Sequence, residues 1–477
     1  MPARFISGWH LSAARSLVTS SLIPFIKNPT ASMPTLASNR RRFLQSAAGA
    51  AVAPLILPGR VWSADTAPSE KVVMGFIGTG KQSRGLMNRF LSDPNVQVVA
   101  VCDVDTTRRE DAKAKVDKHY SNSDCKAYND FREITTNKSI NAVCIATPDH
   151  WHAIVSISAV ENGKDVYCEK PLTHNIFEAI RIVEIVRKNN RILQTGSMQR
   201  SSAEFRIACE LVRNGIIGEI KTVDTSFGDP AKPNSNKEEA MEPGLDWDRW
   251  CGPAPLVPYS PVLSPRGIHD NFPAWRMTRE FGGGMITDWG AHHIDIAQWG
   301  LGMDENGPVE IIAPAEWDKP NARGAQLVYA NGVVLTHVNG KGVTFKGTEG
   351  EISVNRGKFE VILKGQQKAK FWDKEVDKGT SLQREYTLME REFLADAKVK
   401  LYNSKDQIGD FLECIKSRQK PICDVGIGAS SAISCHLMSL AYYHGVNMKW
   451  DPIKHTFLSG GDPKWLTREY RGEWKVA

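Results

Sequence analysis

Cysteines with the spacing of a metal site or a disulfide framework are missing from this sequence. The chain has 477 residues and nine cysteines, an odd number spread widely along it, and no two of them form a CxxC pair. Cys102, Cys144 and Cys168 lie within apolar runs, which is typical of packed thiols. We therefore predict no zinc or other metal site.

Acidic residues are absent from the first 64 residues, which carry seven Lys and Arg. The rest of the chain has 53 basic and 54 acidic side chains, so the formal charge of +6 comes from this segment alone. A body so close to neutral offers no general attraction for polyanions. We expect neither nucleic acid nor an anionic membrane surface as a partner.

A long hydrophobic run is also missing near the N-terminus. Three arginines, Arg40 to Arg42, precede a mildly apolar stretch at residues 46–57 that is too short to span a bilayer. The segment Asn39-Arg-Arg-Arg-Phe-Leu-Gln45 resembles a twin-arginine (Tat) export signal, with Asn39 and Gln45 departing from the commonest choices. The resemblance implies a periplasmic or secreted protein without a stable membrane anchor.

Residues 1–32 lie upstream of this signal and are basic, Ser-rich and free of acids. We expect translation to start at Met33, which would place the arginines where such signals have them, and cleavage near Ser63 or Ala64. We exclude residues 1–64 from the fold. The remaining length predicts two domains, at residues 65–200 and 201–477.

The first domain opens with the pattern strand, glycine turn, helix, strand, acid. The apolar run Val72–Ile77 leads into Gly78-Thr-Gly80-Lys81, and a second run at Val96–Cys102 ends in Asp103. In this βαβ context a glycine turn and a helix N-terminus bind a dinucleotide, and the acid binds the ribose. Ser83 departs from the usual small third position. Asp103 favours NAD, whereas Lys81, Arg108 and Arg109 keep NADP possible.

Strand-like and helical segments continue to alternate up to Thr195, which predicts a doubly wound parallel sheet. Strands are expected at residues 140–146, 165–168 and 191–195, and helices at residues 153–162 and 176–188. Ligands bind beyond the carboxyl ends of such strands, where Gly78, Asp103, Thr147 and Lys170 fall. Lys170 precedes Pro171, so we expect it at the mouth of a strand on a stiff turn.

The second domain has weaker patterns. Residues 204–214 predict a helix that closes the first domain, and residues 220–227 a strand. Residues 229–275 are irregular and rich in Pro, Gly and Trp, which is typical of either a functional loop or a plain surface cover. Four tryptophans, Trp247, Trp250, Trp275 and Trp289, could stack on a sugar or belong to the core. Further segments predict strands at 310–359, charge-rich helix and loop at 364–405, helices at 406–417 and 429–443, and a packed tail at 450–474.

Asp288 and His292 are spaced as i and i+4 if a helix begins near Thr287. A carboxylate beside an imidazole orients it and favours its protonated form, which suits a general base that removes a hydroxyl proton. The alternative is an N-capping Asp288 and a core His292. We interpret His293 and Asp295 as mainly structural.

Four motifs together are specific: the glycine turn, ATPDHWH at 146–152, CEKPL at 168–172 and DWGAHHID at 288–295. In this order they resemble the Gfo/Idh/MocA oxidoreductases, the family of glucose–fructose oxidoreductase and inositol dehydrogenase. The resemblance implies that Thr147, Pro148, His152, Glu169 and Lys170 line the nicotinamide side of a site. It also implies that Asp288 and His292 are catalytic and that the second domain has an open, largely antiparallel sheet that often forms the oligomer interface.

We therefore predict an exported NAD(P)-dependent oxidoreductase acting on a secondary hydroxyl of a sugar or cyclitol, with cofactor that stays bound because a periplasm holds no free nicotinamide pool. His292 would be the acid/base, Asp288 would orient it, and Lys170 would stabilise the reacting oxygen. Two alternatives remain open. One is an NAD-dependent glycosidase that acts by oxidation and elimination, and the other is an inactive sugar- or nucleotide-binding module.

Overall fold

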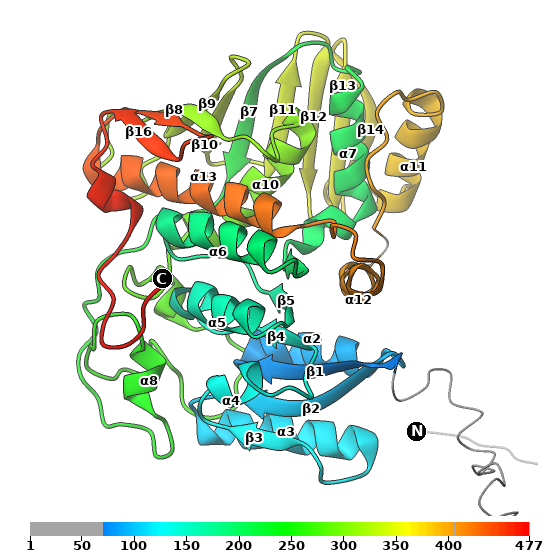
Figure 1. The fold of residues 1–477 in the computed structure, drawn as a ribbon. Coiled ribbons are helices and arrows are strands. Elements are labelled where there is room, and N and C mark those ends of the chain that lie inside the picture. Colours follow the sequence, from blue (N-terminus) through cyan, green and yellow to red (C-terminus); the bar gives the residue numbers. More distant parts are fainter. Residues whose placement is uncertain (1–69, 405, 477) are drawn as a thin grey trace, which may run out of the picture. The chain divides into compact units, whose positions relative to one another are not determined.

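The computed structural model describes residues 70–404 and 406–476, so the Tat-like segment lies outside the described residues. The described part contains two β-sheets, one in each half of the chain, with helices packed against both (Figure 1). All nine cysteines are buried and unpaired, which agrees with their prediction as packed thiols.

The first sheet has six strands in the order β3-β2-β1-β4-β5-β6, and every pair in it is parallel. Its strands are β1 (Val72–Ile77), β2 (Val96–Cys102), β3 (Lys126–Tyr128), β4 (Ala142–Ile145), β5 (Asp165–Cys168) and β6 (Leu193–Thr195). All residues of β4 and β5 are buried, as expected for central strands covered on both faces. The strand order reverses between β1 and β4, which is where such sheets bind ligands.

Helices connect these strands and cover the sheet. They are α2 (Lys81–Leu91), α3 (Thr106–Tyr120), α4 (Arg132–Thr135), α5 (Asp149–Glu161) and α6 (Ile176–Lys188). α6 has the predicted bounds, and its Asn175 N-cap accepts a hydrogen bond from the backbone N–H of Glu178. α5 begins earlier than predicted because Asp149 to His152 of the ATPDHWH motif form its first turn.

The second sheet has ten strands in the order β14-β13-β12-β11-β7-β10-β9-β8-β15-β16. Only the β7–β10 pair is parallel among its described pairs, so the sheet is largely antiparallel, as predicted. Its strands are β7 (Ile220–Ser226), β8 (Pro308–Ile312), β9 (Gln326–Tyr329), β10 (Val334–Val338), β11 (Val343–Gly347), β12 (Gly350–Asn355), β13 (Lys358–Leu363), β14 (Gln366–Phe371), β15 (Met448–Asp451) and β16 (Thr456–Ser459).

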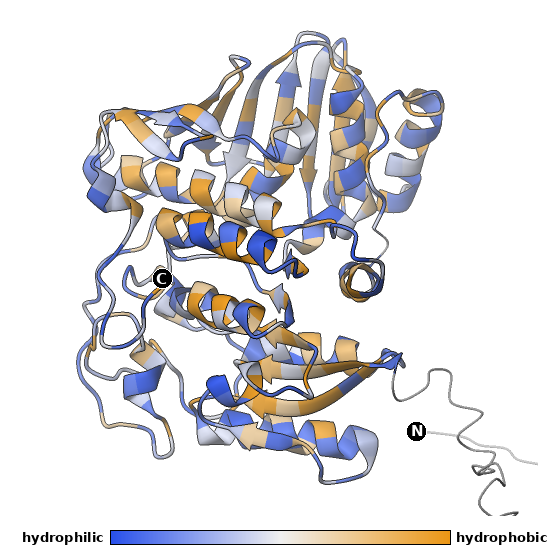
Figure 2. Cartoon of the chain, in the orientation of Figure 1, coloured by the Kyte–Doolittle hydropathy of each residue, from blue (hydrophilic) through white to orange (hydrophobic). Residues whose placement is uncertain are grey.

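Helices α7 (Ala203–Arg213), α9 (Met285–Asp288), α10 (Gly290–Leu301), α11 (Leu382–Phe393) and α13 (Val425–His444) accompany this sheet. α7 packs on α10 and β12 rather than closing the first domain as predicted. α13 is, among the described residues, the helix long and apolar enough to cross a membrane, but 78% of its apolar window is buried against the rest of the protein. Figure 2 colours α13 largely in the hydrophobic range, as suits a core helix between α6 and α10.

Three elements differ from the sequence prediction. The charge-rich stretch 364–405 contains an edge strand, β14, whose first three residues are exposed. Helix α12 (Gln407–Ser417), although late in the chain, packs on the first sheet, where Phe411 meets Phe90 and Tyr167 edge-on. The helix expected to run through Asp288 is broken at Trp289, which separates α9 from α10.

Candidate active site

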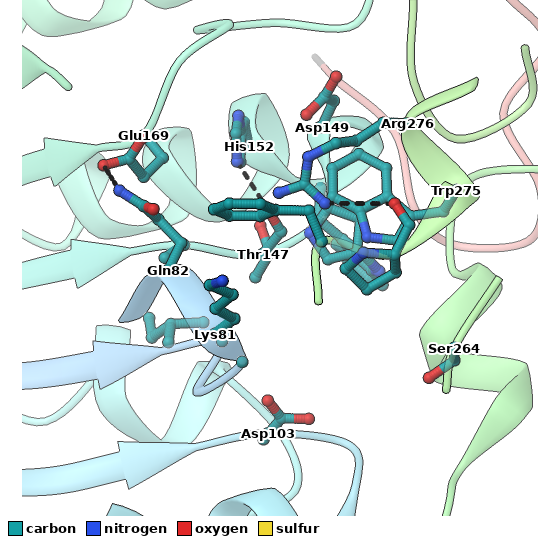
Figure 3. Close-up of a pocket in the computed structure, with 18 of the residues that line it drawn as sticks. Lys81, Gln82, Asp103, Thr147, Asp149, His152, Glu169, Ser264, Trp275 and Arg276 are labelled. Carbon is teal, nitrogen blue, oxygen red and sulfur yellow. Dashed lines mark hydrogen bonds between the residues drawn. The ribbon is translucent and has the colours of Figure 1, made fainter. Parts of the chain in front are cut away.

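A cavity of about 610 Å³ runs along the carboxyl edge of the first sheet and reaches the second domain. The residues that line it include every residue predicted for cofactor binding or catalysis: Gly78, Gly80, Lys81, Asp103, Thr147, Pro148, His152, Glu169, Lys170, Asp288 and His292. Part of this lining is drawn in Figure 3. The cavity therefore joins the predicted dinucleotide end to the predicted catalytic end.

The glycine turn after β1 leaves room for a ligand next to the backbone. Gly78 has φ +80°, and a Cβ there would lie 2.7 Å from the backbone nitrogen of Thr147. Gly80 has open space beside its Cα, and as the N-cap of α2 it leaves the first helical N–H groups without a side-chain cap. No acid occupies the first turn of α2. This arrangement fits the pyrophosphate of a dinucleotide.

Asp103 lies directly after β2 at the same edge. Its carboxylate accepts hydrogen bonds from the backbone N–H of Thr79 at 2.7 Å and of Asp105 at 2.9 Å. Burial raises the pKa of Asp103, against the charge of Arg108 and these two backbone bonds, which lower it. The Thr79 hydroxyl also donates to this carboxylate, at 3.1 Å, and three donors still leave lone pairs on its two oxygens, so the position fits a ribose diol.

Three basic side chains, Lys81, Arg108 and Arg109, could have bound the 2′-phosphate of NADP, but each has a partner within the protein. Arg108 pairs with Asp105 at 3.0 Å, and Arg109 donates to the carbonyl oxygen of Asp103 at 2.6 Å. Lys81 donates to the carbonyl oxygen of Asp270. A 2′-phosphate would therefore have to compete for these side chains beside a carboxylate, so the geometry favours NAD.

Buried polar groups hold the loops at the middle of the cavity. The two ring nitrogens of His152 lie 2.7 Å and 3.0 Å from the carbonyl oxygens of Pro171 and Thr147, in the loops after β5 and β4, and Figure 3 draws the contact to Thr147. A neutral imidazole has one N–H, which donates to one of these two oxygens. Burial lowers the pKa of His152 to about 4, so the imidazole is neutral. Glu169 accepts a hydrogen bond from the Gln82 amide at 3.0 Å, and burial raises its pKa. His152 positions Thr147, whose hydroxyl lies buried without a partner among the described residues.

Lys170 and Asp288 meet across the two domains. The Lys170 ammonium lies 2.5 Å from a carboxylate oxygen of Asp288 and also donates to its backbone carbonyl at 3.0 Å. Burial alone would raise the pKa of Asp288, but the charges of Lys170 and Arg276 hold it below its ordinary value. The Asp288 carboxylate is thus paired with Lys170 and not with His292. The predicted orientation of His292 by the Asp288 carboxylate is not found between these described residues, because Trp289 interrupts the helix between them.

His292 is buried at the catalytic end, at the start of α10. Its Nδ1 has no hydrogen-bond partner among the described residues. Burial, together with the nearby charges of Lys170 and Arg356, lowers the pKa of His292 well below its ordinary value. The imidazole is therefore neutral at neutral pH, which is the state in which it can accept a proton.

The neighbouring motif residues have structural partners, as predicted. His293 lies 2.7 Å from the carbonyl oxygen of Ser226. Asp295 forms a fully buried, two-point ion pair with Arg200, with distances of 2.8 Å and 2.9 Å. Neither His293 nor Asp295 belongs to the cavity lining.

Residues 227–284, between β7 and α9, form a wall of the cavity, and we call them the cover segment. Arg84 of α2 donates to the carbonyl oxygen of His269 at 2.7 Å and pairs with Asp270 at 2.6 Å. Arg108 of α3 donates to the hydroxyl of Ser264 at 3.2 Å. The irregular stretch is therefore attached over the dinucleotide end.

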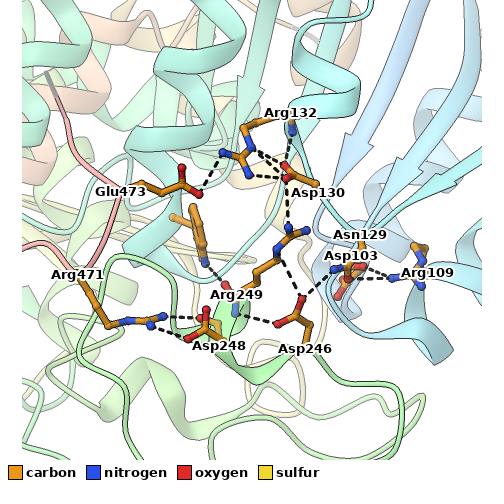
Figure 4. A network of polar contacts seen from close by, with 11 residues as sticks. Asp103, Arg109, Asn129, Asp130, Arg132, Asp246, Asp248, Arg249, Arg471 and Glu473 are labelled. Carbon is orange, nitrogen blue, oxygen red and sulfur yellow. Dashed lines mark hydrogen bonds and ion pairs between the residues drawn. The ribbon is translucent and has the colours of Figure 1, made fainter.

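A polar network extends the attachment beyond the cavity (Figure 4). Asp246, the N-cap of α8 (Trp247–Cys251), accepts from the Asn129 amide at 2.9 Å. Near the end of the chain, Arg471 pairs with Asp248 of α8 at 2.6 Å. Trp474 packs edge-on against Trp151 with ring centroids 4.8 Å apart and lines the cavity. The tail thus packs on the body, as predicted, and supports the cover segment.

Three charged residues at the catalytic end were not identified from the sequence: Asp149, Arg276 and Arg356. Asp149 follows Pro148 in the ATPDHWH motif, and burial raises its pKa to about 8 against the opposing charge of Arg276. Arg276 stacks on Trp275 at 4.3 Å and Arg356 on Trp289 at 4.6 Å. Trp247 belongs instead to a buried cluster, stacked on Trp250.

Known proteins are similar in sequence to part of this chain. An inositol 2-dehydrogenase of Salmonella paratyphi B is 31% identical over 147 residues, 30% of this chain and 42% of that enzyme. A glycosyl hydrolase family 109 protein of Shewanella putrefaciens is 28% identical over 162 residues, 32% of this chain and 34% of that protein. The chain thus spans less than half the length of these curated relatives.

The crystal structure of an aldose-aldose oxidoreductase from Caulobacter crescentus, complexed with glycerol, shares the fold with a TM-score of 0.53 at 19% identity. That likeness covers 80% of this chain and 99% of the other. Two family models match: an oxidoreductase NAD-binding Rossmann fold at residues 72–197 and an oxidoreductase C-terminal alpha/beta domain at residues 217–476. With both domains matched and a cavity that fits the dinucleotide, the chain belongs to the Gfo/Idh/MocA family of NAD-binding oxidoreductases.

Proposed function

We propose that this protein transfers hydride between a nicotinamide cofactor and a carbon that bears a secondary hydroxyl in a sugar or cyclitol. The observation that carries the proposal is the continuous cavity, which places the uncapped N-terminus of α2 at one end and the Lys170–Asp288 pair beside His292 at the other. NAD, when bound, supplies the hydride acceptor or donor. The protein supplies the binding groups and moves the proton.

In the direction of oxidation, His292 takes up the hydroxyl proton on an imidazole nitrogen while the carbon loses hydride. Lys170 donates a hydrogen bond to the same oxygen and stabilises its developing negative charge. Asp288 positions the Lys170 ammonium through the 2.5 Å contact. This role replaces the predicted orientation of His292 by Asp288. In the reverse direction the same imidazole returns the proton.

We further propose that the cofactor stays bound through successive turnovers. The attachments of the cover segment to α2 and α3 support this, because cofactor release would require them to open. Catalysis would then be ping-pong, with one substrate reducing the bound cofactor and a second oxidising it. The Tat-like segment supports export to the periplasm or beyond, where a retained cofactor would be needed, and N-terminal sequencing of the precursor and the mature protein would test that export.

The experiment that tests the function is to denature the purified mature protein and identify any released nucleotide by chromatography and mass. Stoichiometric NAD is expected, and NADP would revise the role of Asp103. If neither is found and added NAD also fails to bind, the proposal is wrong. Release of free NADH at each turnover would contradict the ping-pong part alone.

A glycosidase that oxidises transiently and then eliminates is the second candidate, favoured by the match to the glycosyl hydrolase family 109 protein. A screen with chromogenic glycosides separates the two candidates, because only the glycosidase releases the chromophore. An inactive binding module would instead bind sugar without any change in cofactor absorbance.

We also propose a homo-oligomer formed through the second sheet. The helices α7, α10, α11 and α13 contact neighbouring strands of that sheet. Outward positions on β7 and β10, such as Asp224 and Thr336, are only half-buried. Light scattering after size-exclusion chromatography would test the assembly, and a monomer would overturn it.

A further inference from the structure

The catalytic end of the cavity carries three cationic side chains, Lys170, Arg276 and Arg356. Asp288 is the carboxylate that pairs with the first two, at 2.5 Å for Lys170 and 3.8 Å for Arg276. Its pKa is held low, so it contributes one full negative charge. The single negative charge of Asp288 therefore cannot neutralise both Lys170 and Arg276, and Arg356 adds a third positive charge.

Of the other acids near this end, Asp149 neutralises less than a full charge and Glu169 at most one, against three cations. Burial raises the pKa of Asp149 to about 8, so its carboxyl is mainly protonated at neutral pH. Glu169 has its pKa raised by burial and shares its carboxylate with the Gln82 amide. The catalytic end thus has an excess of positive charge before any ligand binds.

Arg356 lies in the tight turn between β12 and β13, which delivers it to the cavity from the second sheet. Within residues 70–404 and 406–476, its guanidinium has no hydrogen-bond or ion-pair partner, although the ring of Trp289 lies 4.6 Å from it. Partial burial lowers its pKa, against the charges of Asp288 and Glu169, which raise it from beyond ion-pair distance. An arginine in this position has N–H donors free for a ligand.

The two arginines are held in the same way. Each guanidinium lies over an indole, Arg276 over Trp275 at 4.3 Å and Arg356 over Trp289 at 4.6 Å. Stacking on an aromatic face fixes the plane of a guanidinium while leaving its edge available for a carboxylate or phosphate. Trp275 and Trp289, for which the sequence analysis allowed stacking on a sugar, therefore orient the guanidinium groups of Arg276 and Arg356.

We propose that Arg356, assisted by Arg276, binds an anionic substituent of the substrate, so that the preferred substrates are acidic sugars or cyclitols that carry a carboxylate or a phosphate. This inference rests on the proposed function, because it names the substrate class of the same site. The anion would provide the direct ion-pair partner that the Arg356 guanidinium lacks among the described residues. It would also hold the hydroxyl-bearing carbon beside His292 and Lys170, since all of these residues line one cavity.

The test compares substrates that differ only in charge. D-glucose, D-glucuronate and D-glucose 6-phosphate share a ring and differ at carbon 6, and the galactose series and myo-inositol with its 1-phosphate extend the set. Binding to the purified holoprotein is measured by titration calorimetry, and reduction of the bound cofactor by absorbance at 340 nm. The variants are Arg356→Met, which removes the charge, and Arg356→Lys, which keeps it. Arg391→Met, at an exposed position on α11, is the matched control.

We expect at least one acid to bind about 10- to 100-fold more tightly than its neutral partner, as a charge-assisted contact to arginine predicts. Arg356→Met should remove this preference, Arg356→Lys should keep part of it, and Arg391→Met should leave it unchanged. Rising salt should weaken acid binding by the wild-type protein and leave neutral-sugar binding unchanged. This last measurement does not depend on any variant folding.

The inference is overturned if no acid in the set binds more tightly than its neutral partner, or if the preference persists in Arg356→Met. These outcomes are separable from failure of the proposed function. Acid-selective binding without any change at 340 nm would contradict the oxidoreductase and leave the anion site standing. Equal reduction by charged and neutral partners would support the oxidoreductase and remove the anion site.

Discussion

At the scale of single residues, the cavity brings together side chains that follow strands of the first sheet and side chains from the second domain. Asp103, Thr147 and Lys170 were placed correctly at the cavity because each follows a buried strand of the first sheet. Lys170 and Asp288 are 118 residues apart in the sequence, so no local pattern reveals their contact. The i, i+4 rule misled for Asp288 and His292 because it assumes an unbroken helix.

Arg276 and Arg356 had no sequence signal for a different reason. One lies in an irregular segment and the other in a hairpin turn, and neither position has a period that indicates which way its side chain points. Only the tertiary structure brings both to the catalytic end. An arginine beside a tryptophan is too common a pair to predict a site by itself.

The first prediction concerns His292. His292→Asn should lower the rate of reduction of the bound cofactor by about 10²- to 10⁴-fold, because asparagine cannot accept the hydroxyl proton. The pKa of His292 is lowered well below its ordinary value of 6.5, so the base is lost only as the pH falls through that lower value. The wild-type rate should therefore be flat across neutral pH and decline only below about pH 6.5.

Single-turnover absorbance at 340 nm over a pH series measures both effects. Nucleotide content after denaturation serves as the control that the variant still holds its cofactor. An acid limb at or above neutral pH, or the same acid limb in His292→Asn, would show that another group accepts the proton.

At the scale of elements, the cover segment shows what composition can and cannot say. Its irregularity and its tryptophans indicated a loop, and the structure has there only the short helix α8, the 3-10 turn Ala274–Met277 and isolated turns. Composition could not tell a functional loop from a surface cover, because that depends on the surface beneath it. The structure shows that this surface is the carboxyl edge of the first sheet, contacted through Arg84 and Arg108.

The second prediction tests whether the cover segment holds the cofactor. Arg84→Met removes the hydrogen bond to His269 and the ion pair with Asp270, and should speed cofactor release by about 10-fold, as the loss of one or two charge-assisted contacts implies. Arg89→Met is the matched control, since Arg89 lies on the same helix and pairs with Asp406 instead. The measurement is the fraction of nucleotide retained during dialysis against a cofactor scavenger. Equal release from the two variants would show that the cover segment does not limit release.

At the scale of the whole molecule, the alternation of strands and helices predicted the first sheet, whereas the largely antiparallel class of the second sheet was implied by the family resemblance. β14 was missed because an edge strand with exposed lysine and glutamine lacks the apolar alternation of a strand. The position of α12 was missed because an amphipathic pattern indicates a buried face but not its partner. Residues of α12 therefore belong to the buried cluster of the first sheet, although they lie in the second half of the chain.

The third prediction follows from the packing of α12 on the first sheet. Phe411→Ala should lower the free energy of unfolding by about 3–5 kcal/mol, because a fully buried ring is removed from between Phe90 and Tyr167. Leu458→Ala, at a position 65% exposed, should change it by less than about 0.5 kcal/mol. One large cluster includes residues of both sheets, so circular dichroism and tryptophan fluorescence should report one coincident transition. Two separate transitions would show that the domains unfold independently.

Because α12 is synthesised late, the order of translation determines when the apolar face of the first sheet is covered. During translation the first sheet leaves the ribosome with Phe90 and Tyr167 uncovered, and Phe411 follows only after the whole of the second sheet up to β14 has been synthesised. For most of its elongation the nascent chain therefore displays an apolar strip, which is the kind of surface that chaperones bind. Maturation of the coenzyme-binding half must wait for the last quarter of the chain.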